Sequence, residues 1–176
     1  MTDELSLERF VSLKLGESET ELELETADDL CHATDLMVQQ TQHSLEIFTR
    51  DMDEAVYNRA PFLESIRLAC VHNRQMQIRM LVQQSQRAVT LGHRFIELAR
   101  KMSSSIEIRQ VHDDYQQYNQ AFLISDQVGL IKKPFADRFE AIANFNTPVI
   151  AARQREFFTE VWGKSTPDPD MRRLHI

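Results

Sequence analysis

The stretch that decides the fold is residues 76–111, MQIRMLVQQSQRAVTLGHRFIELARKMSSSIEIRQV. It opens with a mainly apolar run, Met76–Val82, and closes with a second one, Ile106–Val111, and both are typical of strands. Between them, apolar residues recur at helical spacing from Ser85, which predicts one long helix that ends at the serine triplet Ser103–Ser105. The predicted buried face of this helix consists of Ala88, Leu91, Phe95, Ile96, Leu98, Ala99 and Met102. Strand, helix and strand joined by short connections predict a right-handed crossover between parallel strands.

The same pattern extends toward the N-terminus. Thr26 or Asp28 can cap a helix that runs to about His43, and the short β-rich run Ser44–Arg50 follows it. Pro61 stands where the first residue of another helix is expected, and that helix leads back to Met76. Repeated alternation of this kind predicts an α/β fold, with a mostly parallel mixed sheet and helices on both faces.

Three further elements are expected around this unit. The alternating residues 19–26, ETELELET, are typical of an edge strand with one solvated face. Tyr118–Leu123 and Val128–Lys132 flank a turn and predict a C-terminal antiparallel hairpin. A closing helix begins near Thr147-Pro148 and ends at Gly163, and its Phe158 and Trp162 are predicted to anchor it to the sheet. We therefore expect a single domain over residues 1–176, with residues 1–26 as an N-terminal extension.

Charge is distributed unevenly along the 176 residues, whose net charge is −7. Residues 1–57 carry 3 basic and 15 acidic side chains, whereas residues 58–110 carry 9 basic and 3 acidic ones. The basic segment could attract an anion or pair with the acidic N-terminal segment, although solvated faces explain most surface charge. An acidic chain of this kind is not an expected nucleic-acid binder.

The start of the chain, MTDELSLERF, lacks the basic and apolar regions of a signal peptide, and no apolar run is long enough to span a bilayer. Cys31 and Cys70 stand singly, without the spacing of a metal or redox motif. We therefore expect a cytoplasmic protein without a membrane association.

From about Leu45 onward, the order of elements resembles the phospholipase D-like superfamily in its single-lobe form. The similarity lies in four strings, which are LEIFT from Leu45, the VHNR ending at Arg74 before QIRMLV, NQAFLISD from Asn119, and FNTP from Phe145 leading to Phe158-x-x-x-Trp162. Each string is short, and their order and spacing carry the resemblance over about three quarters of the chain.

A closer resemblance is to a proteobacterial family of uncharacterised domains that occur alone or appended to acetyltransferase domains. It lies in the strings GHR at Gly92, LAR at Leu98, SSIEIR at Ser104 and STPDPDMRRL at Ser165. This resemblance implies an acetyltransferase as a possible protein partner. The chain itself lacks the glycine-containing loop that holds acetyl-CoA, so an acetyltransferase activity is not expected.

Catalytic members of the superfamily carry the motif H-x-K-x4-D, in which His is the nucleophile, Lys binds the phosphoryl oxygens and Asp orients the imidazole. In this register the chain reads Asn119, Ala121 and Asp126. An amide nitrogen has no available lone pair, and alanine supplies no charge to a phosphate. The resemblance therefore implies a degenerate motif, with no catalytic residues and no phosphodiesterase activity.

Two groups of residues remain as candidate sites. Asn119, Asp126 and Lys132 are expected to line a vestigial pocket near the hairpin, and Arg79, His93 and Arg94 are a candidate anion-binding group. The six histidines form no H-E-x-x-H spacing, so neither a metal nor a cofactor is expected.

The sequence thus predicts a non-enzymatic interaction or regulatory module. The partner is expected to be a second copy of the chain, a homodimer formed through the N-terminal segment, or another protein. Pairing of the edge strand within its own chain is the competing possibility. The alternative function is binding of a phosphate-containing ligand or a nucleic-acid end without hydrolysis. Exposed apolar area at the sheet edge would favour the first function, and arginines converging in a concave site would favour the second.

Overall fold

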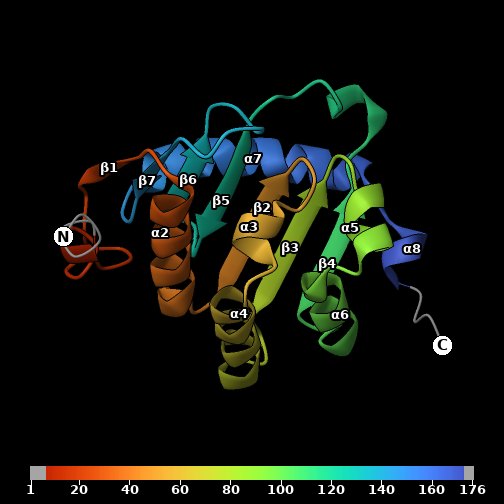
Figure 1. Cartoon of the computed structure of the whole chain (residues 1–176), viewed down its shortest axis with the longest axis horizontal. Helices are drawn as coiled ribbons and strands as arrows, with labels where there is room; N and C mark the ends of the chain where they lie inside the picture. Colours follow the sequence, from red (N-terminus) through yellow and green to blue (C-terminus); the bar gives the residue numbers. More distant parts are fainter. Residues whose placement is uncertain (1–6, 173–176) are drawn as a thin grey trace.

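The computed structural model describes residues 7–172, which form one eight-stranded sheet with helices on both faces (Figure 1). The order of the strands across the sheet is β1-β7-β6-β5-β2-β3-β4-β8. The strands are β1 Glu21–Leu24, β2 Ser44–Thr49, β3 Gln77–Val82, β4 Ile106–Gln110, β5 Ala121–Ser125, β6 Gly129–Lys133, β7 Ala141–Asn144 and β8 Thr166–Pro167. The α/β fold class predicted from the alternating pattern is therefore confirmed.

Parallel pairing is confined to the centre of the sheet. Strand β3 pairs in parallel with β2 and with β4, as the two predicted crossovers require. All other neighbours pair antiparallel, including the predicted β5–β6 hairpin. The sheet is mixed, and its antiparallel part is larger than predicted, because β7 and β8, which were not expected from the sequence, both pair antiparallel.

The helices form two layers around the sheet. On one face lie α2 Ala27–Gln40, α3 Glu54–Tyr57, α4 Ala60–His72, α5 Gln86–Leu91 and α6 Arg94–Lys101, and α7 Pro148–Lys164 crosses the other face (Figure 1). The short helices η1 Asp113–Tyr115 and α8 Pro169–Arg172 complete the fold. Each layer encloses its own apolar cluster, the smaller one lying between α7 and the sheet. No helix within residues 7–172 is long and apolar enough to cross a membrane.

The helix predicted from Ser85 to Met102 is in fact two helices, α5 and α6. Gly92 adopts a left-handed conformation with φ 70°, which ends α5, and the side chain of His93 caps α6. As a result Leu91, which was expected in the core, is 61% exposed. His93, one of the candidate anion-binding residues, is buried.

Helix α7 confirms one part of its prediction and corrects another. Phe158 and Trp162 are buried and stack on each other with ring centroids 5.7 Å apart, as expected for core anchors. Val149 and Ile150 in the first turn of α7 are both exposed. The helix also continues one residue past Gly163.

The N-terminal extension is folded onto the rest of the domain. Strand β1 pairs with β7 of the same chain, and Phe10 and Leu13 are buried in the larger apolar cluster. The backbone N–H of Gly16 donates to the carbonyl of Phe145 over 2.8 Å. One edge of β1 therefore pairs within its own chain, which is the competing possibility that the sequence left open.

Candidate functional site

Asn119, Ala121 and Asp126, the residues compared with the superfamily motif, lie in and beside the β5–β6 hairpin, which does not bring Asn119 and Asp126 together. Asn119 precedes β5 at one end of the sheet, and Asp126 lies in the turn after β5 at the other end. Seven residues of extended chain separate the two by roughly 20 Å. The structure therefore does not form one pocket from Asn119, Asp126 and Lys132.

Asp126 has a structural role in the turn. Its carboxylate accepts hydrogen bonds from the backbone N–H groups of Gln42, His43 and Ser44, at 2.8, 2.7 and 2.9 Å. These bonds fix the connection between α2 and β2 against the hairpin. Within residues 7–172 the hydrogen bonds of this carboxylate come from backbone groups, so it orients no imidazole there.

A buried lysine faces the position where the motif lysine is replaced. Ala121 on β5 is directly opposite Lys133 on β6, and both are buried. The ammonium of Lys133 donates to Asp53 Oδ2 over 2.9 Å and to the carbonyl of Ala136 over 3.1 Å. Lys133 thus places a cation beside the motif position, but a carboxylate from the β2–α3 loop neutralises it.

Lys132, the lysine selected from the sequence, lies on the other face of the sheet. Successive residues of a strand alternate between faces. Lys132 pairs with Phe122, which belongs to the apolar cluster under α7, whereas Ala121 and Lys133 share the opposite face. The alternation of Phe122 and Ile124 with smaller residues could have identified Lys133 as the neighbour of Ala121.

Asn119 is exposed, and its neighbours hold it in place. Its Oδ1 atom accepts a hydrogen bond from the guanidinium of Arg50, and its backbone carbonyl accepts one from the N–H of Ala136 over 2.9 Å. Arg50 follows β2 and Ala136 lies in the β6–β7 loop, so Asn119 joins these two segments. This arrangement contains an amide where the superfamily motif has its nucleophile.

Arg79 lies under α7 and is bound by the protein itself. Its guanidinium donates to Glu46 Oε1, and Glu46 is 1% exposed. The Nε of Arg155 donates to the same oxygen over 3.0 Å. The carbon Cζ of Arg79 also lies 5.4 Å from the ring centroid of Phe158 and 5.3 Å from that of Trp162. The guanidinium of Arg79, which was expected to bind an external anion, therefore neutralises the buried carboxylate of Glu46.

His93 and Arg94 connect the α5–α6 junction to the loops after β2. Nδ1 of His93 accepts from the N–H of Phe95 over 3.2 Å, so Nε2 carries the proton that faces the carbonyl of Met52 at 3.1 Å. Burial lowers the pKa of His93, which favours this neutral form. Arg94 donates to both the side chain and the carbonyl of Asn58. His93 and Arg94 are both bound by protein groups. Arg79 lies on the other face of the sheet, so the three residues do not converge on one anion site.

A hollow of about 450 Å³ lies beside this junction, where the loops after β2 and β3 meet. Its charged lining consists of Asp51, Asp53, Glu54 and Arg87, together with the buried His93. Asp53 is paired with Lys133, and the two other carboxylates, of Asp51 and Glu54, outnumber the guanidinium of Arg87. This lining disfavours a phosphate, because like charges repel and an anion needs convergent donors. The hollow therefore does not form the anion site expected from the sequence.

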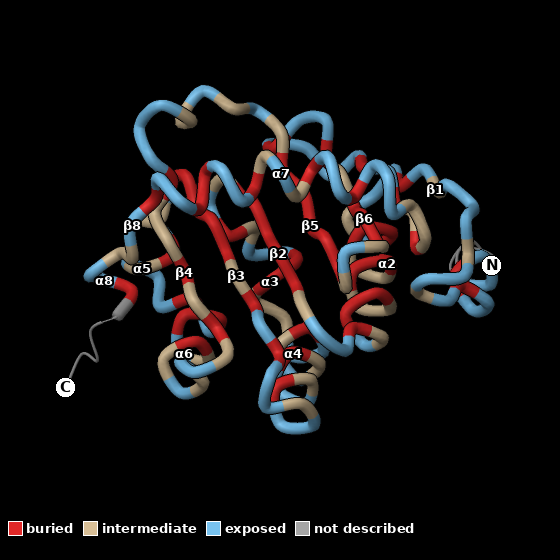
Figure 2. Tube along the Cα trace, turned by 180° about the vertical axis from the view of Figure 1, so that it is seen from behind, coloured by how far each residue is buried: buried red, intermediate tan, exposed pale blue. Residues whose placement is uncertain are grey.

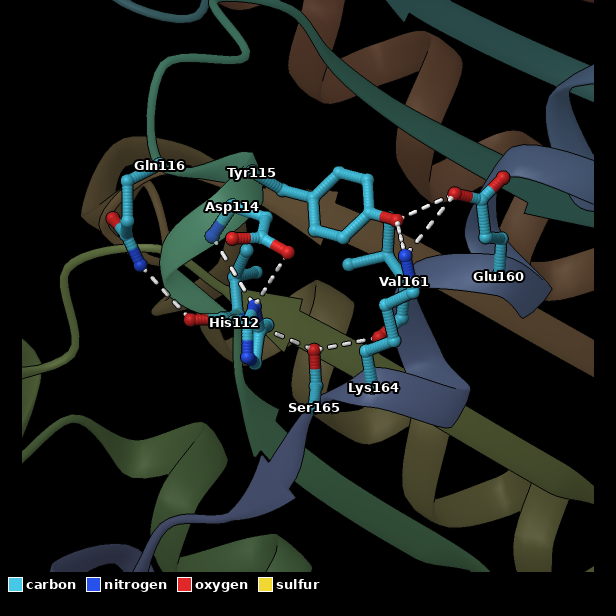
Figure 3. A network of polar contacts seen from close by, with 9 residues as sticks. His112, Asp114, Tyr115, Gln116, Glu160, Val161, Lys164 and Ser165 are labelled. Carbon is cyan, nitrogen blue, oxygen red and sulfur yellow. Dashed lines mark hydrogen bonds and ion pairs between the residues drawn. The ribbon is translucent and has the colours of Figure 1, made fainter.

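The loop that leads to Asn119 is fixed to the end of α7 by a network of polar contacts (Figure 3). The Tyr115 hydroxyl donates to Glu160 and accepts from the ammonium of Lys164 over 2.9 Å. Ser165 Oγ accepts from the backbone N–H of His112 over 3.2 Å. Nδ1 of His112 in turn accepts from the N–H of Asp114, so this histidine caps η1. The network anchors the β4–β5 loop.

Solved structures with the same fold belong to proteins of several kinds. TrmBL2, an archaeal chromatin protein that binds DNA, matches with a TM-score of 0.64 and 16% identity over 94% of this chain. The present chain covers 59% of the chromatin protein. Nuc from Salmonella typhimurium, a phospholipase D family member, matches with a TM-score of 0.61 and 11% identity, over 85% of this chain and 99% of Nuc.

NucT from Helicobacter pylori matches with a TM-score of 0.57 and 8% identity, over 85% of this chain and 99% of NucT. At these identities the similarity establishes the fold alone, which is phospholipase D-like as the sequence resemblance implied. A search among proteins with curated descriptions finds no match. A family model described as Domain of unknown function (DUF7931) matches residues 26–174. The chain therefore belongs to the DUF7931 family, which in this protein has a phospholipase D-like fold.

Proposed function

We propose that this protein is a non-catalytic interaction module built on a phospholipase D-like fold. The observation that carries the proposal is the state of the motif positions. An amide stands in place of the nucleophile, and the adjacent ammonium of Lys133 is buried and bound by Asp53 at 2.9 Å. A fold that presents no nucleophile at these positions, and whose lysine beside Ala121 is bound by a carboxylate, is expected to act by binding.

The distribution of exposed apolar residues also supports this proposal. Ile142 on β7, next to the edge strand β1, is 39% exposed, and Val149 and Ile150 at the start of α7 are 67% and 49% exposed. By contrast, Arg79 and Arg94 are bound to protein groups and lie apart. The exposed side chains favour a protein partner. The sequence resemblance suggests an acetyltransferase as the class of protein partner.

Binding of a nucleic-acid end or another phosphate-containing ligand is the alternative. The fold of TrmBL2, which binds DNA, makes the alternative worth testing. The net charge of −7 and the internal pairing of Arg79 and Lys133 argue against it. We expect a fluorescently labelled single-stranded oligonucleotide to show no saturable binding at physiological salt.

The decisive experiment measures phosphodiesterase activity. The purified protein is assayed on bis-para-nitrophenyl phosphate and on nucleic acid, with and without a chelator. We expect no turnover above the buffer rate, because Asn119 cannot form a phosphoryl-enzyme bond.

Two variants complete this experiment. Asn119→His/Ala121→Lys restores two motif residues, and any activity it gains shows that the assay can detect hydrolysis on this fold. Asn119→Ala removes only the exposed amide. Metal-independent turnover by the wild type that Asn119→Ala abolishes would overturn the proposed function.

A further inference from the structure

The outer edge of strand β4 is only partly paired. Strand β4 spans Ile106–Gln110, but β8 pairs only with Arg109 and Gln110, at the C-terminal end of β4 (Figure 2). Strand β8 does not continue along β4, because the chain turns into α8 at Pro169. Within residues 7–172, the first three residues of β4 therefore have no partner strand on this side.

The hydrogen bonds between β4 and β3 show which backbone groups point to the outer edge. In a parallel pair, alternate residues of a strand direct both their N–H and their C=O toward the same neighbour. The carbonyl of Ser105 accepts from the N–H of Ile78 over 2.8 Å, and the N–H of Val111 donates to the carbonyl of Val82 over 2.9 Å. Residues 105, 107, 109 and 111 therefore face β3, and residues 106, 108 and 110 face the outer edge.

Ile108 is the residue whose outward backbone groups are both unpaired. The N–H of Ile106 donates to the carbonyl of Met102 over 3.0 Å, and Gln110 is opposite Thr166 of β8. In the described part of the chain, no hydrogen bond engages the N–H or C=O of Ile108, or the C=O of Ile106. Such a row of unpaired donors and acceptors is a template for another strand.

A hollow of about 450 Å³, here called the β4 hollow, lies along this unpaired stretch. It is lined by Ala99 and Arg100 of α6, by Ser103, by residues 106–108 of β4 and by Met171 of α8. The guanidinium of Arg100 donates to the carbonyls of Asp170 and Met171, at 2.9 and 2.8 Å, so α8 is fixed to α6. The borders of the β4 hollow are therefore held in place beside the unpaired backbone groups.

We propose that this stretch of β4 binds a short extended segment of another protein, which continues the line of β8 as an antiparallel strand. The residue opposite Ile108 exchanges two hydrogen bonds with it, and its side chain lies on the face of α6, where an apolar group fits the β4 hollow. The next residue lies opposite Glu107, whose side chain is on the other face and is 40% exposed, so a basic group fits there. The segment is thus recognised by its backbone and by apolar residues on either side of a basic one.

This inference rests on the proposed function, because it names a surface and a kind of partner for the interaction module. An extended chain fits better than a second copy of the protein. Ile106 and Ile108 are only 3% and 7% exposed between α6 and α8, so a slender segment reaches their backbone, whereas a second copy would bring its own β8 and α8 against these elements. A nucleic acid has no matching row of backbone amide and carbonyl groups.

Fluorescence anisotropy with a labelled peptide, Thr-Val-Lys-Val-Thr, tests the proposal on the full 176-residue chain. In the proposed register its valines are opposite Ile106 and Ile108, and its lysine is opposite Glu107. N-methylation of either valine removes an N–H that pairs with β4 and is expected to weaken binding about tenfold. N-methylation of the lysine is the matched control, because its N–H points away from β4, and it is expected to leave the affinity nearly unchanged. All of these peptides carry the same charge.

Amide hydrogen exchange, followed by NMR, locates the bound peptide. In the free protein the amide of Ile108 is expected to exchange faster than those of Glu107 and Arg109, which donate to β3, and the peptide is expected to slow it about tenfold. Ser103→Trp fills the β4 hollow and is expected to abolish binding. Ser104→Trp changes the adjacent exposed serine, which does not line the hollow, and is expected to bind as the wild type does. The amide spectra show whether both variants are folded.

Several results would overturn the proposal. They are absence of saturable binding at about 1 mM peptide, equal effects of N-methylation at valine and at lysine, and equal binding by the two tryptophan variants. Slow exchange of the Ile108 amide in the free protein would also overturn it, including protection by self-association that depends on protein concentration. These outcomes are distinct from failure of the proposed function, which is decided by turnover in the phosphodiesterase assay.

Discussion

At the scale of single residues, the ammonium of Lys133, which lies opposite Ala121, is bound by the carboxylate of Asp53. Both side chains are largely buried, at 10% and 17% exposure, and the ammonium also donates to the carbonyl of Ala136. Replacing Lys133 with methionine would leave the Asp53 carboxylate buried without its counter-charge. We expect Lys133→Met to lower the free energy of unfolding by about 3 kcal/mol in urea titrations.

The matched control for this substitution is Arg67→Met, which removes one partner of the exposed pair of Arg67 and Glu64 on α4. Solvent screens that pair, so little change in stability is expected. The double variant Lys133→Met/Asp53→Asn should recover part of the loss, since no uncompensated charge remains. Equal, small effects of Lys133→Met and Arg67→Met would show that the buried pair is not structurally important.

His93 makes a second prediction at the residue scale, which concerns pH. Burial lowers the pKa of His93 in the folded state below its usual value of 6.5, so the unfolded chain binds more protons just below that pH. The contribution of His93 to stability is therefore complete above about pH 6.5 and is lost as the pH falls toward the lower folded pKa. The free energy of unfolding should decrease between about pH 7 and pH 5.

His93→Asn isolates this contribution, because asparagine can cap α6 but does not titrate. The decrease between about pH 7 and pH 5 should be smaller in the variant than in the wild type, since other groups continue to titrate. Identical pH profiles for the two proteins would mean that His93 is not responsible for any of the decrease.

At the scale of elements, the N-terminal extension behaves as part of the domain. It supplies β1, which pairs with β7, and it buries Phe10 and Leu13 against the helices of the larger apolar cluster. Gln40 of α2 accepts from the N–H of Leu15 over 2.8 Å and donates to the carbonyl of Leu13 over 3.0 Å. These contacts explain why the extension is folded although it precedes the region that resembles the single-lobe superfamily.

A chain that begins at Ala27 should therefore be less stable than the full chain. Loss of the burial of Phe10 and Leu13 alone is worth about 3–6 kcal/mol, and the outer edge of β7 also loses its partner. Chemical denaturation of both chains at the same low concentration measures the difference. Phe10→Ala in the full chain retains β1, and this variant should reproduce part of the loss in the free energy of unfolding. Unchanged stability of the shortened chain would show that the extension contributes only to association.

At the scale of the whole molecule, the two faces of the sheet serve different purposes. Five helices cover one face, whereas α7 alone crosses the other and leaves the strip on β7 and β1 uncovered. Part of the uneven charge of the chain is compensated internally, as by the ion pair of Arg79 and Glu46.

The sequence by itself determined the fold class and most of the elements. The period of the apolar residues and the capping signals predicted the central crossovers, the hairpin and the buried Phe158 and Trp162, because these patterns depend on local geometry. The identity and spacing of Asn119, Ala121 and Asp126 can likewise be read from the sequence, and the degenerate motif inferred from them stays a prediction.

Only the tertiary structure decided which charges are available. Arg79 and Lys133 each find a carboxylate from a segment that is far away in the sequence, and His93 is buried because Gly92 divides the predicted helix into two. Strand β7 was missed because its four residues have too short a pattern to separate from a loop. Pairing across a sheet depends on which strands become neighbours, and this order is set by the packing of the whole chain and not by local sequence.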